Sequence, residues 1–266
     1  MDGFKTIGIT GAGGFIGKEF SKYLYGKNHK LILFSEEEII EDRKIKYIKK
    51  DLNKCTYKDF IGIDVLFHFA GTSINEGALE KNFKLTEITL NNSIQAGVKK
   101  FFLASSYAVY GPRKNPAKPR DELMPLDEYS LSKILSEYLL KKEILDNSIK
   151  GSIIRICSIY GEEGKGLINI LREKIRNRDK INLEGEFERQ YLYVKDLCKI
   201  FDLILSKDKC NLIYNVSGER VNTKEIYSFL KNKKLDVQFI KKQKASYLCE
   251  GIDIDKQTNV KKFLSN

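Results

Sequence analysis

The stretch TGAGGFIG, at residues 10–17, decides the fold of this chain. Its glycines Gly11, Gly14 and Gly17 lie between a strand-length apolar run, TIGIT at 6–10, and a segment with helical spacing. Glycines at this spacing permit a tight turn, let backbone N–H groups approach a pyrophosphate and let the helix pack close to the strand. The stretch therefore predicts a dinucleotide site at the end of the first strand.

Apolar runs of strand length alternate with helical segments on the C-terminal side of this loop. They are KLILF at 30–34, IKYI at 45–48, IDVLFHFA at 63–70, a helical stretch at 77–96, KKFFLA at 99–104 and GSIIRI at 151–156. This alternation predicts an α/β fold of the Rossmann type, a doubly wound parallel sheet covered by helices on both faces.

A smaller C-terminal lobe is expected after this sheet. Beyond about residue 160 the strands become short and polar loops separate the helices. We therefore expect residues 1–160 to form the nucleotide-binding domain with the catalytic groups, and residues 161–266 to form a mixed α/β lobe that binds the substrate. No linker rich in Pro, Gly or Ser divides the two parts, so they are expected to share one core.

Composition narrows the class of protein. The 266 residues are 42% hydrophobic, enough for a sizeable core. No stretch reaches the roughly 18 uninterrupted apolar residues of a membrane span, and the start MDGFKTIGIT lacks a basic leader with an apolar signal core. The five cysteines are scattered and form no CxxC motif, so they predict neither disulfides nor a metal site. We expect a cytoplasmic protein that does not contact a membrane.

The chain is basic, with 47 Lys and Arg against 36 Asp and Glu, a net charge of +11. The lysines occur in short clusters along the whole length, which is typical of a solvated surface rather than of a nucleic-acid stripe. No nucleic-acid partner is therefore expected. Such a surface also attracts a small anionic substrate.

Nearly the whole chain resembles the extended short-chain dehydrogenase/reductase superfamily of nucleotide-sugar epimerases, dehydratases and reductases. The motifs that carry this resemblance are TGAGGFIG at 10–17, Asp51-Leu52, HFAG at 68–71, Asn82 with Thr86, SSYAVYG at 105–111, YSLSK at 129–133, RICSIYG at 155–161, RQYLYVKD at 189–196 and YNVSG at 214–218. The resemblance also implies a homodimer, formed through the helix that carries YSLSK and the helix at 77–96.

The resemblance implies a set of residues around the cofactor. They are Gly11, Gly14, Phe15, Ile16, Gly17, Ser35, Asp51, Leu52, Phe69, Ala70, Gly71, Asn82, Tyr129 and Lys133.

The YSLSK motif places Tyr129 and Lys133 one helical turn apart on the same face of a helix. A cation there is expected to stabilise the phenolate and to lower the pKa of Tyr129, which then exchanges a proton near neutral pH. By itself such a pair is also typical of an exposed helix. The resemblance implies that Tyr129 is the acid or base and that Ser106 hydrogen-bonds the reacting oxygen, whereas Ser105 is expected to be structural.

The residues that follow Ser106 narrow the reaction. Dehydratases of the family carry an Asp-Glu pair there and related decarboxylases a glutamate, whereas this chain has Tyr107 and Ala108. The two histidines, His29 and His68, both precede this region, so no histidine follows Ser106 that could act as a second acid or base. His68 is expected to be structural. Hydride chemistry with one acid/base tyrosine remains. It fits a nucleotide-sugar 4-epimerase first and, as an alternative, a 4-ketoreductase that uses NADPH or NADH. A non-catalytic NAD(P)-binding regulator is a further alternative, against which the intact catalytic residues argue.

The end of the second strand bears on the choice of cofactor. Ser35 stands where NAD users carry an Asp that accepts from the ribose 2′-OH. Three glutamates follow at 36–38, and they would repel a 2′-phosphate unless Arg43 or Lys44 folds back over the site. NAD is therefore favoured over NADP.

The expected substrate is a nucleotide-diphosphate sugar. Arg189 aligns with the family's arginine that pairs with the diphosphate, and a planar guanidinium suits bidentate binding of phosphate. Ser158 stands where most relatives have an Asn, and Tyr107 and Ser106 complete the expected substrate contacts. Arg155 is equally consistent with a structural ion pair.

Overall fold

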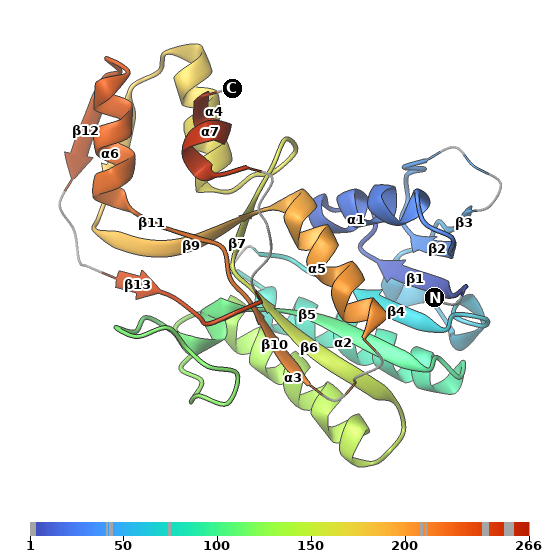
Figure 1. Ribbon diagram of the computed structural model, residues 1–266. Coiled ribbons are helices and arrows are strands. Elements are labelled where there is room, and N and C mark those ends of the chain that lie inside the picture. The colour runs from blue at the N-terminus through green and yellow to red at the C-terminus, as the bar shows by residue number, and fades with distance from the viewer. Residues whose placement is uncertain are drawn as a thin grey trace.

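A computed structural model describes residues 4–40, 42, 45–73, 76–207, 210, 212–240, 245–252 and 258–265. At its centre is a seven-stranded, fully parallel sheet with the strand order β10-β6-β5-β4-β1-β2-β3 (Figure 1). The strands are β1 (Thr6–Thr10), β2 (Lys30–Phe34), β3 (Ile45–Ile48), β4 (Val65–His68), β5 (Lys100–Ser106), β6 (Lys150–Ile156) and β10 (Ile213–Val216). The order reverses direction between β1 and β4, so the carboxyl ends of these two strands flank the crevice in which ligands of such sheets bind.

Helices cover both faces of this sheet, as expected. On one face lie α1 (Phe15–Tyr25) and α5 (Val194–Ser206), and on the other α2 (Ala78–Gln95) and α3 (Glu128–Leu145) (Figure 1). The alternation of side chains along the strands creates two cores. On β5, for example, Phe102 packs toward α1 and α5, whereas Phe101 and Leu103 pack toward α2 and α3. The predicted Rossmann-type fold is confirmed.

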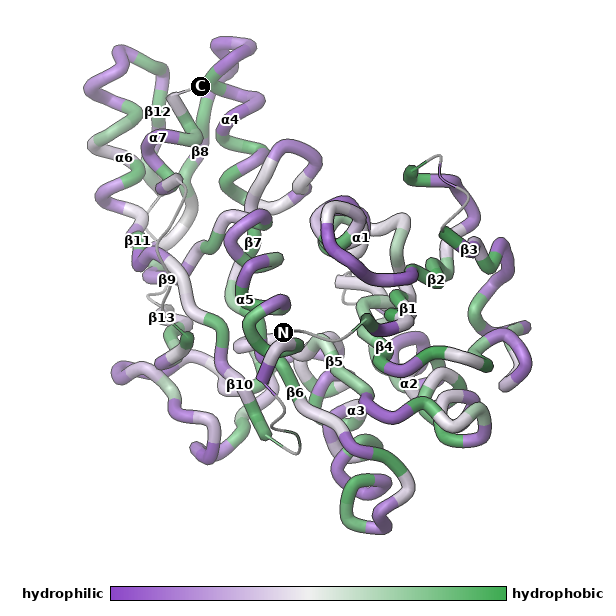
Figure 2. Tube along the Cα trace, turned by 45° about the vertical axis from the view of Figure 1, so that its right-hand side comes forward, coloured by the Kyte–Doolittle hydropathy of each residue, from purple (hydrophilic) through white to green (hydrophobic). Residues whose placement is uncertain are grey.

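The smaller lobe has its own apolar core and two short sheets. Its elements are β7 (Ser158–Tyr160), α4 (Leu167–Asn177), β8 (Ile181–Glu184), β9 (Phe187–Tyr193), β11 (Glu219–Asn222), α6 (Thr223–Asn232), β12 (Val237–Ile240), β13 (Ala245–Tyr247) and α7 (Val260–Ser265). Strand β9 pairs with β7, β11 and β13, and β12 pairs with β8. In Figure 2 hydrophobic segments follow the strands at the centre of the molecule, while hydrophilic segments recur along outer helices such as α6.

Two elements beyond residue 160 belong with the large sheet. Helix α5 packs against α1, and β10 pairs in parallel with β6 at the edge of the sheet. The chain thus leaves the sheet after β6, builds part of the lobe and returns, so residues 161–266 contribute to both regions.

Candidate active site

The glycine-rich loop joins β1 to α1. Gly11 adopts a φ of +68°, and a Cβ atom there would lie 2.7 Å from the backbone nitrogen of Ala70. A Cβ atom on Gly17 would collide with the carbonyl oxygen of Gly11. The N-cap residue is Gly14, which brings no side chain to the N–H groups that the first turn of a helix leaves without intrahelical partners. These groups, at the positive end of the helix dipole, fit the pyrophosphate of a dinucleotide.

Phe15 and Ile16, the two hydrophobic residues after Gly14, pack in different places. Phe15 lies against the loop that follows β7, where Cβ atoms on Gly161 and Gly164 would come within 3.1 and 3.2 Å of its ring. Ile16 packs at the edge of the core between β1 and α5. Phe15 therefore connects the nucleotide loop to the smaller lobe, and only the backbone of this pair is placed to meet a phosphate.

At the end of β2, Ser35 lies beside the glycine-rich loop, with its Oγ 3.0 Å from where a Cβ of Gly13 would stand. Its hydroxyl donates to the carbonyl of Glu37 at 2.8 Å and accepts from the N–H of the same residue at 3.2 Å. The side chain thus closes a local turn. Arg43 and Lys44, which were considered as phosphate partners, lie outside the described residues.

The next expected pair, Asp51 and Leu52, is used locally in the structure. Asp51 caps the short helix η1 (Leu52–Lys54), where its carboxylate accepts from the backbone N–H and the side-chain amide of Asn53 at 3.0 and 2.9 Å. The side chain of Leu52 is buried in the core beneath α2. Asp51 and Leu52 can therefore contact a cofactor only through their backbone atoms or through the exposed edge of the Asp51 side chain.

The loop after β4 is held by Asn82 of α2. Its Oδ1 accepts from the N–H of Thr72 at 2.7 Å, and its Nδ2 donates to the carbonyl of Thr72 at 3.0 Å and to Ser132 Oγ at 2.9 Å. The neighbouring Phe69 packs in an aromatic cluster of the core. The side-chain amide of Asn82, an expected cofactor residue, is thus engaged by the protein and positions the loop that carries Ala70 and Gly71.

The three expected catalytic residues lie together. Ser106 ends β5, and its side chain hydrogen-bonds that of Tyr129, the second residue of α3. One turn later Lys133 donates from Nζ to the carbonyl of Ala104 at 3.0 Å, with Nζ 5.8 Å from the centre of the Tyr129 ring. A Cβ on Gly71 would lie 3.9 Å from the same Nζ, so the ammonium faces the loop after β4.

Burial shifts the pKa values of Tyr129 and Lys133. It raises the pKa of Tyr129, an effect that the hydrogen bond from Ser106 opposes and the charge of Asp127 reinforces. It also lowers the pKa of Lys133 to about 8, against the charge of Glu137. The expected lowering of the Tyr129 pKa is therefore wrong for the protein alone, because desolvation of the phenolate and the charge of Asp127 outweigh the hydrogen bond from Ser106.

A buried polar network lies behind the catalytic residues. Glu137, one turn after Lys133, accepts from Ser105 Oγ at 2.6 Å and pairs with Arg155 through bonds of 2.9 and 2.6 Å. Arg155 also donates to the Tyr110 hydroxyl at 2.7 Å. The structural interpretations of Ser105 and Arg155 agree with these contacts. Sequence reasoning missed Glu137, although its spacing of four from Lys133 was a usable signal.

His68 has the structural role expected for it. The ring lies between the hydroxyls of Thr10, 2.7 Å from Nδ1, and Thr86, 3.2 Å from Nε2. Burial, assisted by the charge of Lys133, lowers its pKa to about 3. The imidazole is thus neutral at physiological pH and exchanges no proton there.

The expected substrate residues meet where the lobe joins the sheet. The hydroxyls of Tyr107 and Ser158 are 2.9 Å apart. On the adjoining strand β9, the guanidinium of Arg189 lies over the rings of Phe187 and Tyr247, 5.1 and 5.4 Å from their centres. Sequence reasoning missed both rings, and the position of Tyr247 depends on strand pairing that no local pattern signals.

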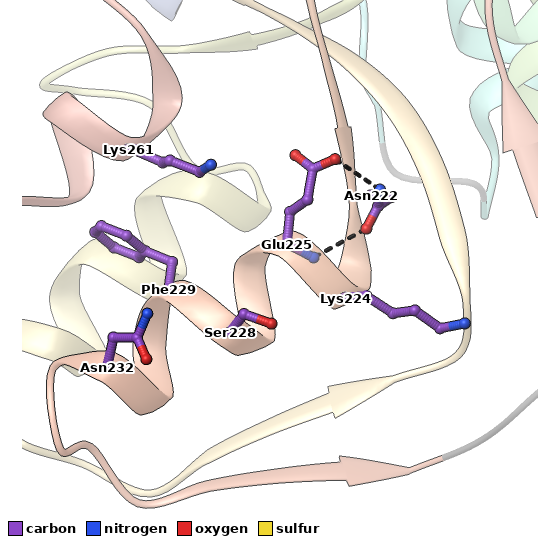
Figure 3. Close-up of a pocket in the computed structure, with 7 residues that line it drawn as sticks. All are labelled: Asn222, Lys224, Glu225, Ser228, Phe229, Asn232 and Lys261. Carbon is purple, nitrogen blue, oxygen red and sulfur yellow. Dashed lines mark hydrogen bonds between the residues drawn. The ribbon is translucent and has the colours of Figure 1, made fainter.

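A surface cavity of about 400 Å³ lies elsewhere, on α6 and α7 of the lobe (Figure 3). Its lining residues are Asn222, Lys224, Glu225, Ser228, Phe229, Asn232 and Lys261. The cavity contains none of the expected catalytic or substrate residues.

In the part of the chain that the structure describes, no helix is long and apolar enough to cross a membrane. No group of three or more His, Cys, Asp or Glu side chains in the same residues is arranged to hold a metal ion.

The parallel sheet, the glycine-rich loop and the grouped Ser106, Tyr129 and Lys133 define an NAD(P)-dependent enzyme of the extended short-chain dehydrogenase/reductase class. Residues 7–217 match the model of the NAD dependent epimerase/dehydratase family, and the chain belongs to that family. It is therefore an enzyme of the group that includes nucleotide-sugar epimerases, dehydratases and reductases.

Individual relatives differ in activity. The chain is 30% identical over 276 residues to the dTDP-4-dehydro-6-deoxyglucose reductase of Escherichia coli, covering 90% of this chain and 86% of the relative. It is 26% identical over 254 residues to the dTDP-D-glucose 4,6-dehydratase of Dictyostelium discoideum, covering 81% and 58%. Among solved structures, a UDP-glucuronic acid 4-epimerase from Bacillus cereus, in complex with NAD, superposes with a TM-score of 0.89 at 17% identity over 98% of this chain and 96% of that chain.

Proposed function

We propose that this enzyme transfers a hydride at C4 of a nucleotide-diphosphate sugar, as the reductase of a 4-keto sugar. The observation that carries the proposal is the grouping of Ser106, Tyr129 and Lys133 beside a segment that holds Tyr107 and Ala108. Elimination of water needs a second acid–base pair, and this segment does not supply one. Proton transfer coupled to hydride transfer needs only the tyrosine.

Each catalytic side chain has a task in this reaction. Ser106 hydrogen-bonds the carbonyl oxygen and holds it near Tyr129. The raised pKa of Tyr129 keeps its hydroxyl protonated near neutral pH, so it donates the proton that the reduced oxygen needs. Lys133, with its pKa near 8, carries a positive charge below that pH and stabilises the phenolate that remains. When bound, the nicotinamide cofactor supplies the hydride.

NAD(H) is the proposed cofactor. The backbone N–H groups after Gly14, the loop at 69–71 and Lys133 fit the pyrophosphate and the ribose of a dinucleotide. Exposed glutamates follow Ser35 at the adenosine end, where they disfavour a 2′-phosphate. NADPH is the alternative that the same fold accommodates.

The E. coli relative favours reduction, since it covers most of this chain at 30% identity and is named as a 4-keto sugar reductase. A 4-epimerase is the second candidate, and one contact favours it. Phe15 packs against Gly161 and Gly164, and Lys18 of α1 pairs with Glu163 at 2.7 Å, so the loop after β7 is tied to the helix of the nucleotide loop. Such a tie slows exchange of the cofactor, which an epimerase does not need to release.

Analysis of the bound nucleotide distinguishes the two candidates. The purified protein is denatured, any released nucleotide is identified by mass spectrometry, and the protein is titrated with NAD, NADH and NADPH. A reductase is expected to bind NADH reversibly and to oxidise it with a dTDP- or UDP-4-keto-6-deoxy sugar. Stoichiometric NAD that survives purification, with interconversion of 4-epimers and no net oxidation of NADH, would instead establish the epimerase.

A further inference from the structure

Arg189 lies over aromatic rings, and no carboxylate of the described residues forms an ion pair with it. Its guanidinium carbon lies 5.1 Å from the ring centre of Phe187 and 5.4 Å from that of Tyr247. Rings at this distance attract a cation without neutralising its charge, and they restrict where the planar group can lie. The arginine thus keeps its charge available for an anion.

Two buried polar atoms of the same strand point to a ligand. Arg189 Nε and the hydroxyl of Tyr191 are shielded from solvent and make no hydrogen bond of good geometry within the described residues, although the two side chains are neighbours and the guanidinium opposes the rise that burial causes in the pKa of Tyr191. Leaving a buried donor without a partner is destabilising, so such atoms call for an explanation. The N–H groups of the Arg189 guanidinium and the neighbouring Tyr191 hydroxyl are donors that suit the oxygens of a diphosphate.

Tyr247 connects this arginine to the catalytic segment. It comes from β13, which pairs in parallel with β9 so that Tyr247 stands in register with Arg189. The Tyr247 ring also meets that of Tyr107 edge to face, with centres 6.2 Å apart. Tyr107 directly follows Ser106, so the ring of Tyr247 packs between the arginine and the segment that carries the reacting groups.

We propose that Tyr247, together with Phe187, is a positioning residue that orients Arg189 for the diphosphate of the substrate. The inference rests on the proposed function, because it takes a nucleoside diphosphate as the ligand of Arg189. The aromatic ring of Tyr247 orients the guanidinium of Arg189, and the hydroxyl of Tyr247 is not needed for this role. Replacing the ring leaves the charge of Arg189 in place but lets the guanidinium move.

Isothermal titration calorimetry of the full chain with UDP and dTDP tests this, with NADH as a second ligand. Tyr247→Leu is expected to weaken binding of the diphosphate about tenfold, the equivalent of one desolvated cation–π contact. Tyr247→Phe should bind within about twofold of the wild type, and Phe187→Leu should weaken binding as Tyr247→Leu does. Tyr227→Leu is the matched control, since Tyr227 is a half-buried lobe residue with Lys231 over its ring. NADH binding should be unchanged in all four variants, which also reports that each is folded.

The outcomes separate the inference from the proposed function. If Arg189→Ala binds UDP and dTDP like the wild type, or if the wild type binds neither, the diphosphate assignment fails and the inference fails with it. If Arg189→Ala loses binding but Tyr247→Leu does not, the proposed function stands and the positioning role is refuted. Equal losses in Tyr247→Phe and Tyr247→Leu would show that the hydroxyl matters, which also overturns the inference.

Discussion

Tyr129 and Lys133 are both pushed toward their neutral forms by burial, and this shapes the chemistry that they favour. A tyrosine with a raised pKa is a poor base, but it stays protonated near neutral pH and can donate its proton. A lysine with a pKa near 8 carries its charge at neutral pH and loses it within reach of ordinary assay buffers. The pair is therefore set, in the absence of ligands, for protonation of a developing alkoxide.

Removal of the Tyr129 hydroxyl is expected to abolish turnover with little effect on the fold. Tyr129→Phe should reduce kcat by about 10²- to 10⁴-fold, the usual contribution of a positioned acid or base. Its affinity for NADH should stay within about twofold of the wild type, because the ring is retained. Steady-state kinetics and fluorescence titration measure the two effects. Tyr138→Phe, an exposed tyrosine of the same helix, is the control, and full activity in Tyr129→Phe would refute the catalytic role.

The pH profile of kcat should follow the charge of Lys133. The groups that face Lys133 are Tyr129, Glu137, His68 and the Ala104 carbonyl. His68 has a pKa of about 3 and stays neutral, so it contributes no change between pH 5 and 8. Lys133 is charged below pH 8 and loses its proton as the pH rises through that value, so kcat is expected to fall there.

Glu137→Gln tests whether the charge of Lys133 causes this high-pH limb, the fall in kcat as the pH rises through 8. The variant removes a charge that raises the pKa of Lys133, so the fall in kcat should move to lower pH. A purely structural role of Glu137 would lower kcat at every pH without moving the limb. A fall in kcat that stays at the same pH would refute the expectation that the charge of Glu137 sets the pKa behind it.

Helix α1 begins where two backbone segments touch, and this explains the glycine at its third position. A Cβ on Gly17 would collide with the carbonyl oxygen of Gly11, whereas at Gly26, the C-cap of the helix, the nearest atom outside its chain neighbours would be 3.8 Å away. Gly17→Ala should move the glycine-rich loop, lower NADH affinity at least about tenfold and destabilise the fold by about 1–3 kcal/mol. Gly26→Ala should leave both within about 1 kcal/mol of the wild type, because its φ of −74° suits alanine. Calorimetry and urea denaturation compare the pair, and equal behaviour would contradict the close approach.

Helix α3 is tied to the sheet by the buried pair of Glu137 and Arg155. Glu137→Ala leaves a buried guanidinium without its partner and should reduce the free energy of unfolding by about 3–5 kcal/mol. Glu143→Ala, on the same helix, breaks a pair with the exposed Lys142 and should cost less than about 1 kcal/mol. Urea denaturation measures both. A small effect of Glu137→Ala would mean that water or another side chain reaches Arg155.

At the scale of the whole molecule, we expect α3 to form the interface of a homodimer. Tyr138 and Leu145 of this helix are 64% and 80% exposed, and Leu131 is 36% exposed. Light scattering after size-exclusion chromatography should show a dimer that Tyr138→Asp converts to a monomer. Leu203→Asp is the control, since Leu203 is a 37% exposed apolar residue on α5, at the opposite face of the sheet. A monomeric wild type would refute the expectation.

The sequence by itself determined the features that depend on short spacings. The glycine-rich loop at 10–17, the alternation of strands and helices, and the pairing of Tyr129 with Lys133 follow from residues at most a few positions apart. Each such pattern has one local geometry that satisfies it, whether a tight turn, a strand period or a helical turn. The fold class and the placement of Tyr129 one helical turn from Lys133 were therefore predictable.

Only the tertiary structure decided features that depend on distant segments and on burial. Four contacts join residues that no local pattern connects. Strand β10 returns to the sheet beside β6, and Asn82 binds the 69–72 loop. Glu137 forms an ion pair with Arg155, and the guanidinium of Arg189 lies over the ring of Tyr247. The raised pKa of Tyr129 belongs with them. Its spacing from Lys133 predicted a lowered value, but the free energy of a charge depends on how much water the surrounding fold removes, and packing sets that quantity.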